Sequence, residues 1–401
     1  MQNSRKINND LYYIGASDRR LSLFENVYPI PRGVSYNSYV MLDEKTTLLD
    51  TADAAVGRQF FENLAGALQG RNLDYMIINH MEPDHCALIE EVLLRYPHTT
   101  IVTNKKASEM IRQFFDLNLD GRLMIVGEGD SLNTGRHCFH FVLAPMVHWP
   151  EAMVSYDSCD HILFSADAFG TFGALNGNIF ADEVEFEREW LNDARRYFTN
   201  IVGKYGPQVQ ALLKKAATLE IDMICPLHGP IWRANINWFV HKYDLWSTYK
   251  PECKGVAIVY GSVYGNTEAA ANLLAAKLAD KGIRNIKMYD VSHTDVSKLV
   301  SETFHYSHLV LAAATYNAGI FTPMENFLLD LKAHNMQQRT CAIIENGTWA
   351  PQSGKMMRAL LEQMKGMTVL GENFTLKSSM KASQEKELDQ LADLLVESLN
   401  K

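Results

Sequence analysis

The chain has 401 residues, of which 47% are hydrophobic and 21% are charged, and its formal net charge is −9. These values predict two or three folded domains with large apolar cores rather than a disordered chain. The acidic charge disfavours a surface that binds nucleic-acid phosphates, and no apolar run approaches the roughly 20 residues of a membrane-spanning helix. Six scattered cysteines without a C-x-x-C pair disfavour a disulfide framework or an attached rubredoxin module. The N-terminus carries no apolar leader, so we expect a cytoplasmic protein with no membrane or nucleic-acid partner.

The N-terminal half, from Asp10 to about Cys225, carries short strand candidates in groups, with helices gathered after them. Apolar runs and alternating patterns predict strands over 12–14, 33–42, 46–50, 75–79, 99–103, 123–126, 139–143, 153–157 and 161–165. Helical spacing covers 57–69, 186–202 and 207–219. Strands and helices in this order favour packed sheets that are covered by helices.

The most informative motif in this half is His80-Met81-Glu82-Pro83-Asp84-His85, which directly follows the buried strand predicted over 75–79. It brings imidazoles and carboxylates together at the edge of a sheet. Nitrogen donors mixed with oxygen donors suit iron or manganese, whereas thiolate sets favour zinc. Taken alone, Asp84 is also explained as the N-cap of a helix that begins after it.

Three further residues that can bind a metal also come just after predicted strands: His148, Asp167 and His228. Side chains at strand ends are held by a rigid scaffold, as a functional site requires. With the motif they make three histidines and three carboxylates, more than one tetrahedral metal uses, so we predict two metal ions with a bridging carboxylate. Each residue alone is weak evidence, because a single histidine such as His148 is more often a hydrogen-bonded structural residue.

The segment 247–254 has no apolar period and contains a proline, and we predict it as a linker. After it the pattern alternates strictly, with strands over 256–261, 286–289, 308–314, 340–345 and 367–370, and helices over 266–280, 296–303, 324–333, 355–363 and 383–399. Five strands with intervening helices predict a doubly wound five-stranded parallel sheet. We therefore expect an α/β protein with one domain over residues 1–250 and a second over 254–401.

Three loops follow strands at the carboxyl edge of this sheet, where ligands bind in such folds. The first holds small and hydroxyl residues before a helix N-terminus, a setting that wraps a phosphate, although alone it is also consistent with an ordinary β–α turn. The other two offer Tyr316 and Trp349 to lie against a flat ring system. The predicted binding residues are Ser262, Val263, Tyr264, Gly265, Asn266, Thr267, Thr315, Tyr316, Asn317, Gly319, Asn346, Gly347, Thr348 and Trp349.

The region from about Lys254 to Lys401 resembles a flavodoxin, whose phosphate loop reads T/S-x-T-G-x-T. This chain has Ser262-x-Tyr264-Gly265-x-Thr267, so a tyrosine replaces the middle hydroxyl residue while the backbone amide remains. The other two loops match the flavodoxin loops that flank the isoalloxazine ring. The resemblance implies that this half binds FMN.

The N-terminal half resembles the metallo-β-lactamase fold, an αββα sandwich whose signature is H-x-H-x-D-H followed by His, Asp and His. Glu82 stands where the second histidine would be, which is the variant seen in flavodiiron proteins. With the flavodoxin-like half, the resemblance to flavodiiron proteins covers essentially the whole chain. It implies that one iron is held by His80, Glu82 and His148, the other by Asp84 and His228, with Asp167 as the bridge. His85 lies beside the irons in this assignment, as a residue that relays protons without necessarily binding iron.

This resemblance implies an oxidoreductase that reduces O2 to water, NO to N2O, or both. Two ferrous ions and one reduced FMN hold four electrons, the number that O2 needs to become two waters. The electrons would come from a separate donor protein, with rubredoxin as the first candidate. The family also implies a head-to-tail homodimer or a dimer of dimers, in which the flavin of one subunit lies beside the irons of another.

Two other functions are compatible with parts of the sequence. The first is a zinc-dependent hydrolase of the metallo-β-lactamase fold with a fused flavodoxin-like regulatory domain, although Glu82 speaks against it. The second is an electron carrier or gas sensor in which the irons only bind. Metal and flavin content separate the first from a reductase, and consumption of O2 or NO over many turnovers separates the second.

Overall fold

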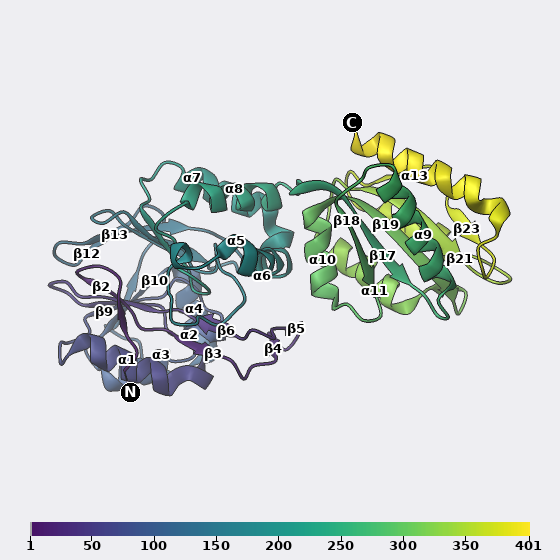
Figure 1. Cartoon of the computed structure of the whole chain (residues 1–401). Helices are drawn as coiled ribbons and strands as arrows, with labels where there is room; N and C mark the ends of the chain where they lie inside the picture. The colour runs from purple at the N-terminus through teal and green to yellow at the C-terminus, as the bar shows by residue number, and fades with distance from the viewer. Residues whose placement is uncertain (1) are drawn as a thin grey trace. The chain divides into compact units, whose positions relative to one another are not determined.

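The computed structural model describes residues 2–401, which form two compact units (Figure 1). The first unit comprises the chain up to Phe198 together with Pro207–Asp244, and the second comprises Thr199–Gly206 together with Leu245–Lys401. No helix among residues 2–401 is both long enough and apolar enough to span a bilayer.

The first unit is built around a seven-stranded mixed sheet. Its order is β1-β2-β7-β8-β9-β10-β11, antiparallel from β1 to β8 and parallel from β8 to β11. The strands are β1 (Arg5–Lys6), β2 (Leu11–Tyr13), β7 (Tyr39–Met41), β8 (Thr47–Leu49), β9 (Tyr75–Ile77), β10 (Thr100–Thr103) and β11 (Leu123–Ile125). Two small hairpins accompany it, one of β3 (Ala16–Asp18) with β6 (Val34–Tyr36) and one of β4 (Leu23–Phe24) with β5 (Tyr28–Pro29).

A second, five-stranded sheet packs against the first. Its strands, in spatial order, are β12 (Ser131–Asn133), β13 (Cys138–Leu143), β14 (Met153–Asp157), β15 (Ile162–Phe164) and β16 (Met223–Cys225), and only the last pair is parallel. The rings of Tyr39 in β7 and Phe164 in β15 are 5.6 Å apart, centroid to centroid. Contacts of this kind between inward-facing side chains form the core between the two sheets.

Helices cover the outer faces of these sheets, with α1 and α3 on the side of the first sheet and α7 and α8 on the side of the second (Figure 1). Phe60, Leu64 and Leu68 follow helical spacing along α1 and are buried. The predicted αββα sandwich is confirmed. The helices of this unit are η1 (Ala54–Val56), α1 (Gly57–Leu68), α2 (Pro83–Cys86), α3 (Ile89–Arg95), α4 (Lys105–Phe114), η2 (Ala181–Glu183), α5 (Phe186–Glu189), α6 (Leu191–Tyr197), α7 (Gly206–Ala216) and α8 (Ile236–Ser247). Between α6 and α7 lie η3 (Phe198–Val202) and η4 (Gly203–Tyr205), which from Thr199 onward belong to the second unit.

Two predicted elements of this unit are interrupted in the structure. The strand predicted over 33–42 is divided into β6 and β7 at Asn37, whose side-chain amide donates to the backbone oxygens of Pro226 and Gly229 (2.9 and 2.8 Å). The helix predicted over 186–202 breaks into α5 and α6 at Trp190, whose buried ring packs against Gly173. In both places a buried long-range contact overrides the local pattern.

The second unit is a parallel sheet in the order β18-β17-β19-β21-β22. The strands are β17 (Cys253–Gly261), β18 (Ile286–Asp290), β19 (Tyr306–Tyr316), β21 (Thr340–Asn346) and β22 (Thr368–Val369), and the short β20 (Gly319–Ile320) and β23 (Phe374–Leu376) pair with β19 and β21. The predicted five-stranded, doubly wound parallel sheet is confirmed. Its fifth position is shared by two short strands, and the predicted strand over 367–370 corresponds to β22 only.

Helices cover both faces of this sheet, with α9 and α13 on one face and α10 and α11 on the other (Figure 1). Val256 and Ile258 of β17 pack with Leu274 of α9 and Leu395 of α13 in one apolar core. The helices are α9 (Asn266–Asp280), α10 (Val296–His305), α11 (Thr322–Ala333), α12 (Ser353–Leu361), η5 (Ala382–Gln384) and α13 (Glu385–Leu399). This layered arrangement leaves the loops after β17, β19 and β21 free to form a site.

A buried arginine ties together the base of the second unit. The guanidinium of Arg339, of which 1% is exposed, donates to the backbone oxygens of Thr303 (2.7 Å), Phe304 (3.2 Å) and Tyr249 (2.6 Å). Further bonds reach the oxygens of residues 337 and 338. The charge is thus held by carbonyl dipoles rather than by a carboxylate.

Replacing Arg339 with methionine is expected to lower the free energy of unfolding by about 3 kcal/mol, because it leaves several buried carbonyl groups without a donor. Urea denaturation followed by circular dichroism would measure the loss. The control is Arg284→Met, which removes an exposed arginine from the same unit. Equal denaturation midpoints for the two variants would contradict the assigned role of Arg339.

Candidate metal centre and flavin pocket

The motif His80 to His85 begins just beyond β9 and is fixed there by a buried carboxylate. Asp50, at the end of β8, accepts hydrogen bonds from the backbone N–H of Asn79 (2.7 Å) and from its side-chain amide (2.8 Å). It also accepts a longer bond from the backbone N–H of His80 (3.3 Å). Burial raises the pKa of Asp50 to about 6 despite these donors. Glu82 precedes α2, so that Asp84 and His85 fall in its single turn.

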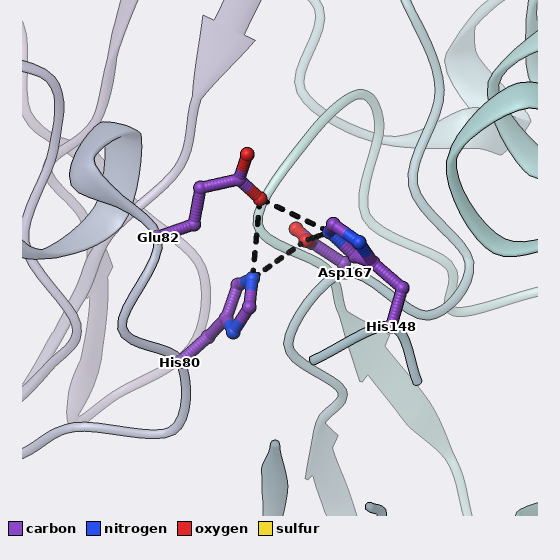
Figure 2. Close-up of side chains that lie close together, drawn as sticks. All are labelled: His80, Glu82, His148 and Asp167. Atoms are coloured by element: carbon purple, nitrogen blue, oxygen red, sulfur yellow. Dashed lines mark hydrogen bonds and ion pairs between the residues drawn. The ribbon is translucent and has the colours of Figure 1, made fainter. Parts of the chain in front are cut away.

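Four of the predicted ligands meet in a first cluster, made by His80, Glu82, His148 and Asp167 (Figure 2). The Nε2 atom of His80 lies 3.3 Å from Glu82 Oε2 and 3.1 Å from Asp167 Oδ2. The Nε2 atom of His148 lies 3.0 and 3.1 Å from the same two oxygens. Two nitrogens and two oxygens therefore surround one point, with all four side chains buried.

A second cluster consists of Asp84, His85 and His228. The Nε2 atoms of His85 and His228 are 3.0 Å apart, and both face Asp84 Oδ2, at 3.3 and 3.2 Å. His85 therefore lies within this cluster, in direct contact with its other two side chains. Two ring nitrogens this close need a proton or a cation between them, because neutral lone pairs repel.

Asp167 stands between the clusters and presents one oxygen to each. Its Oδ2 atom faces His80 and His148, whereas its Oδ1 atom lies 3.2 Å from His85 Nε2 and 3.6 Å from His228 Nε2. A carboxylate in this position is suited to bridge two cations. The structure therefore brings all six predicted metal residues, and His85 with them, into one site.

Two further groups orient these ligands, one a side chain and one a backbone oxygen, and neither was assigned this role from the sequence. Glu151 faces His80 Nδ1 at 2.9 Å and accepts from the backbone N–H of Met81, and the backbone oxygen of Ser35 lies 2.7 Å from His228 Nδ1. These contacts direct the Nε2 atom of each ring into the cluster. Desolvation together with the nearby carboxylate of Glu82 raises the pKa of Glu25, in the β4–β5 turn, to about 8.

The donor set fits a pair of metal ions. Asp84 Oδ1 and Oδ2, Asp167 Oδ1 and His85 Nδ1 are buried atoms that have no hydrogen-bond partner within residues 2–401. Leaving buried charged oxygens without a donor is costly unless a cation neutralises them. Imidazole and carboxylate donors without any thiolate match iron or manganese.

In the first cluster, each histidine and carboxylate favours the charged form of its neighbours. Burial would lower the pKa of His148, but Asp167 and Glu82 beside it raise that pKa from 6.5 to about 9. Burial would raise the pKa of Glu82, but His148 and His80 lower it well below its usual range. Without metal, these histidines therefore carry protons that a metal must displace.

The metal-free protein is expected to lose stability as pH rises from about 6.5 to about 9. A histidine whose folded-state pKa is raised stabilises the fold fully below its unfolded pKa of 6.5, and this contribution disappears as pH passes its folded-state pKa of about 9. Melting temperatures of metal-free protein across this range would show the decline. The metal-loaded protein serves as the control, because its histidines carry no such proton, and an identical pH profile for both forms would contradict the assignment.

In the second unit, the loops after β17, β19 and β21 enclose a pocket of about 540 Å³. Most of the predicted FMN residues line it: Ser262, Val263, Tyr264, Asn266, Thr267, Thr315, Tyr316, Asn317, Asn346, Gly347, Thr348 and Trp349. Gly265 and Gly319 do not line it, although Gly265 adopts the left-handed conformation (φ 88°) that turns the chain into α9. Ala314, Ala318, Ala350, Gln352 and Ser378 line it without having been predicted.

Hydrogen bonds connect the loops of this pocket. The backbone N–H of Gly265 donates to Ser262 Oγ at 3.0 Å, which closes the first loop. The side-chain amide of Asn346 donates to the backbone oxygen of Ser378 (2.8 Å) and to Thr267 Oγ1 (3.3 Å). Tyr264 and Trp349 are 92% and 89% exposed, so two large aromatic rings stand free at the rim. A flat aromatic ligand with a phosphate fits this combination of rings, hydroxyls and helix N-terminus.

Two family profiles match the chain, the ODP family of beta-lactamases over residues 34–229 and flavodoxin over residues 258–391. An uncharacterized protein of Methanocaldococcus jannaschii is 32% identical over 323 residues, which covers 80% of each chain. The anaerobic nitric oxide reductase flavorubredoxin of Aliivibrio salmonicida is 31% identical over 349 residues, which covers 86% of this chain and 69% of that protein.

Solved structures show the same architecture over the full length. The rubredoxin oxygen:oxidoreductase of Desulfovibrio gigas superposes with a TM-score of 0.92 at 26% identity and covers 99% of each chain. The flavodiiron protein of Giardia intestinalis has the same TM-score at 23% identity, and the match covers 100% of this chain and 98% of that protein. At this level of identity the likeness shows the fold alone. The likeness therefore includes both units in one chain.

Proposed function

We propose that this chain, which belongs to the flavodiiron protein family, is an oxidoreductase that reduces dioxygen to water, nitric oxide to nitrous oxide, or both. The relatives named for these activities are a nitric oxide reductase flavorubredoxin and a rubredoxin oxygen:oxidoreductase. The observation that carries the proposal is the position of Asp167, which presents one oxygen to each of two buried histidine–carboxylate clusters. The alternative function, a zinc-dependent hydrolase, gives no role to the flavodoxin domain in the same chain.

The proposed ligands of one iron are His80, Glu82 and His148, those of the other are Asp84 and His228, and Asp167 is the proposed bridge. His85 lies near enough to the second pair to be a further ligand or a proton relay. When bound, two ferrous ions and reduced FMN supply the four electrons for O2, or the two electrons that convert two NO to N2O and one water. The protein's own task is to hold the ligand rings in place, through Glu151 and Ser35.

We further propose the arrangement that supplies electrons to this site. FMN would occupy the pocket formed by the loops after β17, β19 and β21, and an external donor such as rubredoxin would reduce the flavin. A head-to-tail homodimer, or a dimer of dimers, would bring the flavin of one subunit to the metal pair of another. The limits 1–250 and 254–401 are the proposed extents of the two functional domains, and a cytoplasmic location fits such a chain.

The test is to purify the protein without oxygen, measure iron and FMN per chain, and record O2 and NO consumption by the reduced protein with electrodes. We expect two irons and one FMN per chain, and consumption over many turnovers. Zinc as the only metal, with hydrolase activity and no FMN, would overturn the proposal in favour of a hydrolase. A single stoichiometric uptake of gas would instead indicate a carrier or sensor.

A further inference from the structure

The first unit has a cavity that lies outside the metal site and is lined by arginines. It has a volume of about 620 Å³ and lies between β1, β3, the first turn of α1 and the loop 175–179. Four arginines line it, Arg5, Arg19, Arg20 and Arg58, together with a single carboxylate, Glu62. In a chain of net charge −9, this is a local concentration of positive charge.

Two of these arginines are held in place without being neutralised. Arg5 Nη1 donates to the backbone oxygen of Gly177 at 2.7 Å, and Arg19 Nη2 donates to the backbone oxygen of Leu175 (2.5 Å) and to Asn176 Oδ1 (3.1 Å). Across residues 2–401, neither guanidinium has a carboxylate partner. Their remaining N–H groups are therefore available, and their positions are fixed by the same loop.

The other two arginines are only weakly compensated. Arg20 Nε lies 3.8 Å from Asp18 Oδ1, and that carboxylate is already occupied by two backbone N–H groups. Arg58 pairs with Glu62 at 3.2 Å, but 92% of its side chain is exposed. Pairs between exposed side chains neutralise each other weakly.

The shape and lining indicate the class of ligand. Arginine forks match phosphate oxygens in a bidentate manner, and several arginines around one cavity suit more than one phosphate group. The volume lies in the range of sites for small organic ligands and exceeds what a bare phosphate fills. Tyr13, Val56 and Ile179 also line the cavity, but each is almost fully buried, so a nucleoside would fill the space beyond the phosphate groups rather than cover an exposed apolar surface.

We propose that this cavity binds a nucleoside diphosphate, with Arg5 and Arg19 on its phosphate groups. The site is independent of the proposed reductase activity, since none of its residues belongs to either metal cluster or to the flavin pocket.

Isothermal titration calorimetry on the full-length protein loaded with FMN and iron tests the proposal, because the flavin phosphate site is then already filled. The probes are ADP, inorganic pyrophosphate and AMP at low salt. We expect ADP to bind at least ten times more tightly than AMP, more tightly than pyrophosphate, and more weakly when salt is added. Absence of binding by ADP would overturn the proposal, and binding of pyrophosphate in preference to ADP would overturn the nucleoside assignment.

Variants locate the binding. The double variant R5Q/R19Q is expected to weaken ADP binding at least tenfold, whereas R112Q, which removes an exposed arginine on α4, should leave it unchanged. Melting temperature and FMN content establish that each variant is folded. Equal ADP affinity in R5Q/R19Q and the parent protein would overturn the site, and it would do so whether or not the protein proved to be a reductase.

Discussion

Replacing Asp167 with alanine is expected to abolish reduction of both dioxygen and nitric oxide while the flavin stays bound. This carboxylate faces both clusters, with Oδ2 at 3.1 Å from His80 and His148 and Oδ1 at 3.2 Å from His85. Its removal leaves opposed histidine nitrogens without a shared counter-charge, so both metals should bind more weakly. We expect turnover to fall by more than about a hundredfold, since even residues that only orient metal ligands contribute 10- to 100-fold in metal affinity or activity.

The measurements are iron per chain, FMN per chain, and O2 and NO consumption. Asp157→Ala is the matched control, because Asp157 is a buried carboxylate of β14 that contacts His137 at 2.8 Å and not the metal clusters. That variant is expected to lose stability but to keep its iron and its turnover per folded chain. If the Asp167 variant retained two irons and normal turnover, Asp167 could not be the bridge.

Replacing Asn346 with leucine is expected to yield a nearly colourless protein that still contains iron. The amide of Asn346 donates to Ser378 and Thr267 and accepts from the backbone N–H of Ser378 at 3.1 Å, and these bonds join the end of β21 to α9 and to the loop after β23. Three hydrogen bonds at about 1 kcal/mol each correspond to a loss of roughly a hundredfold in FMN affinity. Turnover driven by an external donor should disappear with the flavin.

Fluorescence titration of the flavin-free protein with FMN measures this change directly. Asn373→Leu is the control, since the side-chain oxygen of Asn373 accepts from Arg358 (2.9 Å) in the same unit, away from the pocket. Saturating FMN should restore turnover in the Asn346 variant, because its metal clusters are intact. Unchanged affinity for FMN would remove Asn346 from the binding site, and loss of iron would show that the substitution acts beyond the pocket.

The sequence predicted this site where ligands follow directly from strand ends. His80, Glu82 and Asp84 lie within five residues after one strand, and the loops at Ser262, Thr315 and Asn346 recur after parallel strands, so local pattern and topology are sufficient to group them. The grouping of strands and helices along the chain predicted packed sheets in the first half and a parallel sheet in the second, and the resemblance to known families supplied the αββα order.

The residues that orient the ligands could not be predicted in this way. Ser35 contacts His228 through its backbone oxygen, which carries no side-chain signature, and the two positions are 193 residues apart. Glu151 is 71 residues from His80, and its position shortly after His148 suggested a pocket wall but did not show that it would contact the His80 ring. The break at Trp190 likewise depends on a buried contact with Gly173, which no local window contains. Long-range burial, rather than weak propensity, accounts for these omissions.

The short segment Thr199–Gly206 belongs to the second unit although the chain on both sides of it belongs to the first. Within that unit, the amide of Asn200 donates to the backbone oxygen of Ser297 (3.1 Å), and the Tyr249 hydroxyl donates to that of Gly203 (3.0 Å). A gene fragment that starts at the linker would therefore encode a flavin module lacking one of its own pieces. Exchanging modules between relatives would require transplanting two separate stretches of coding sequence, so the two halves are expected to be inherited together rather than shuffled.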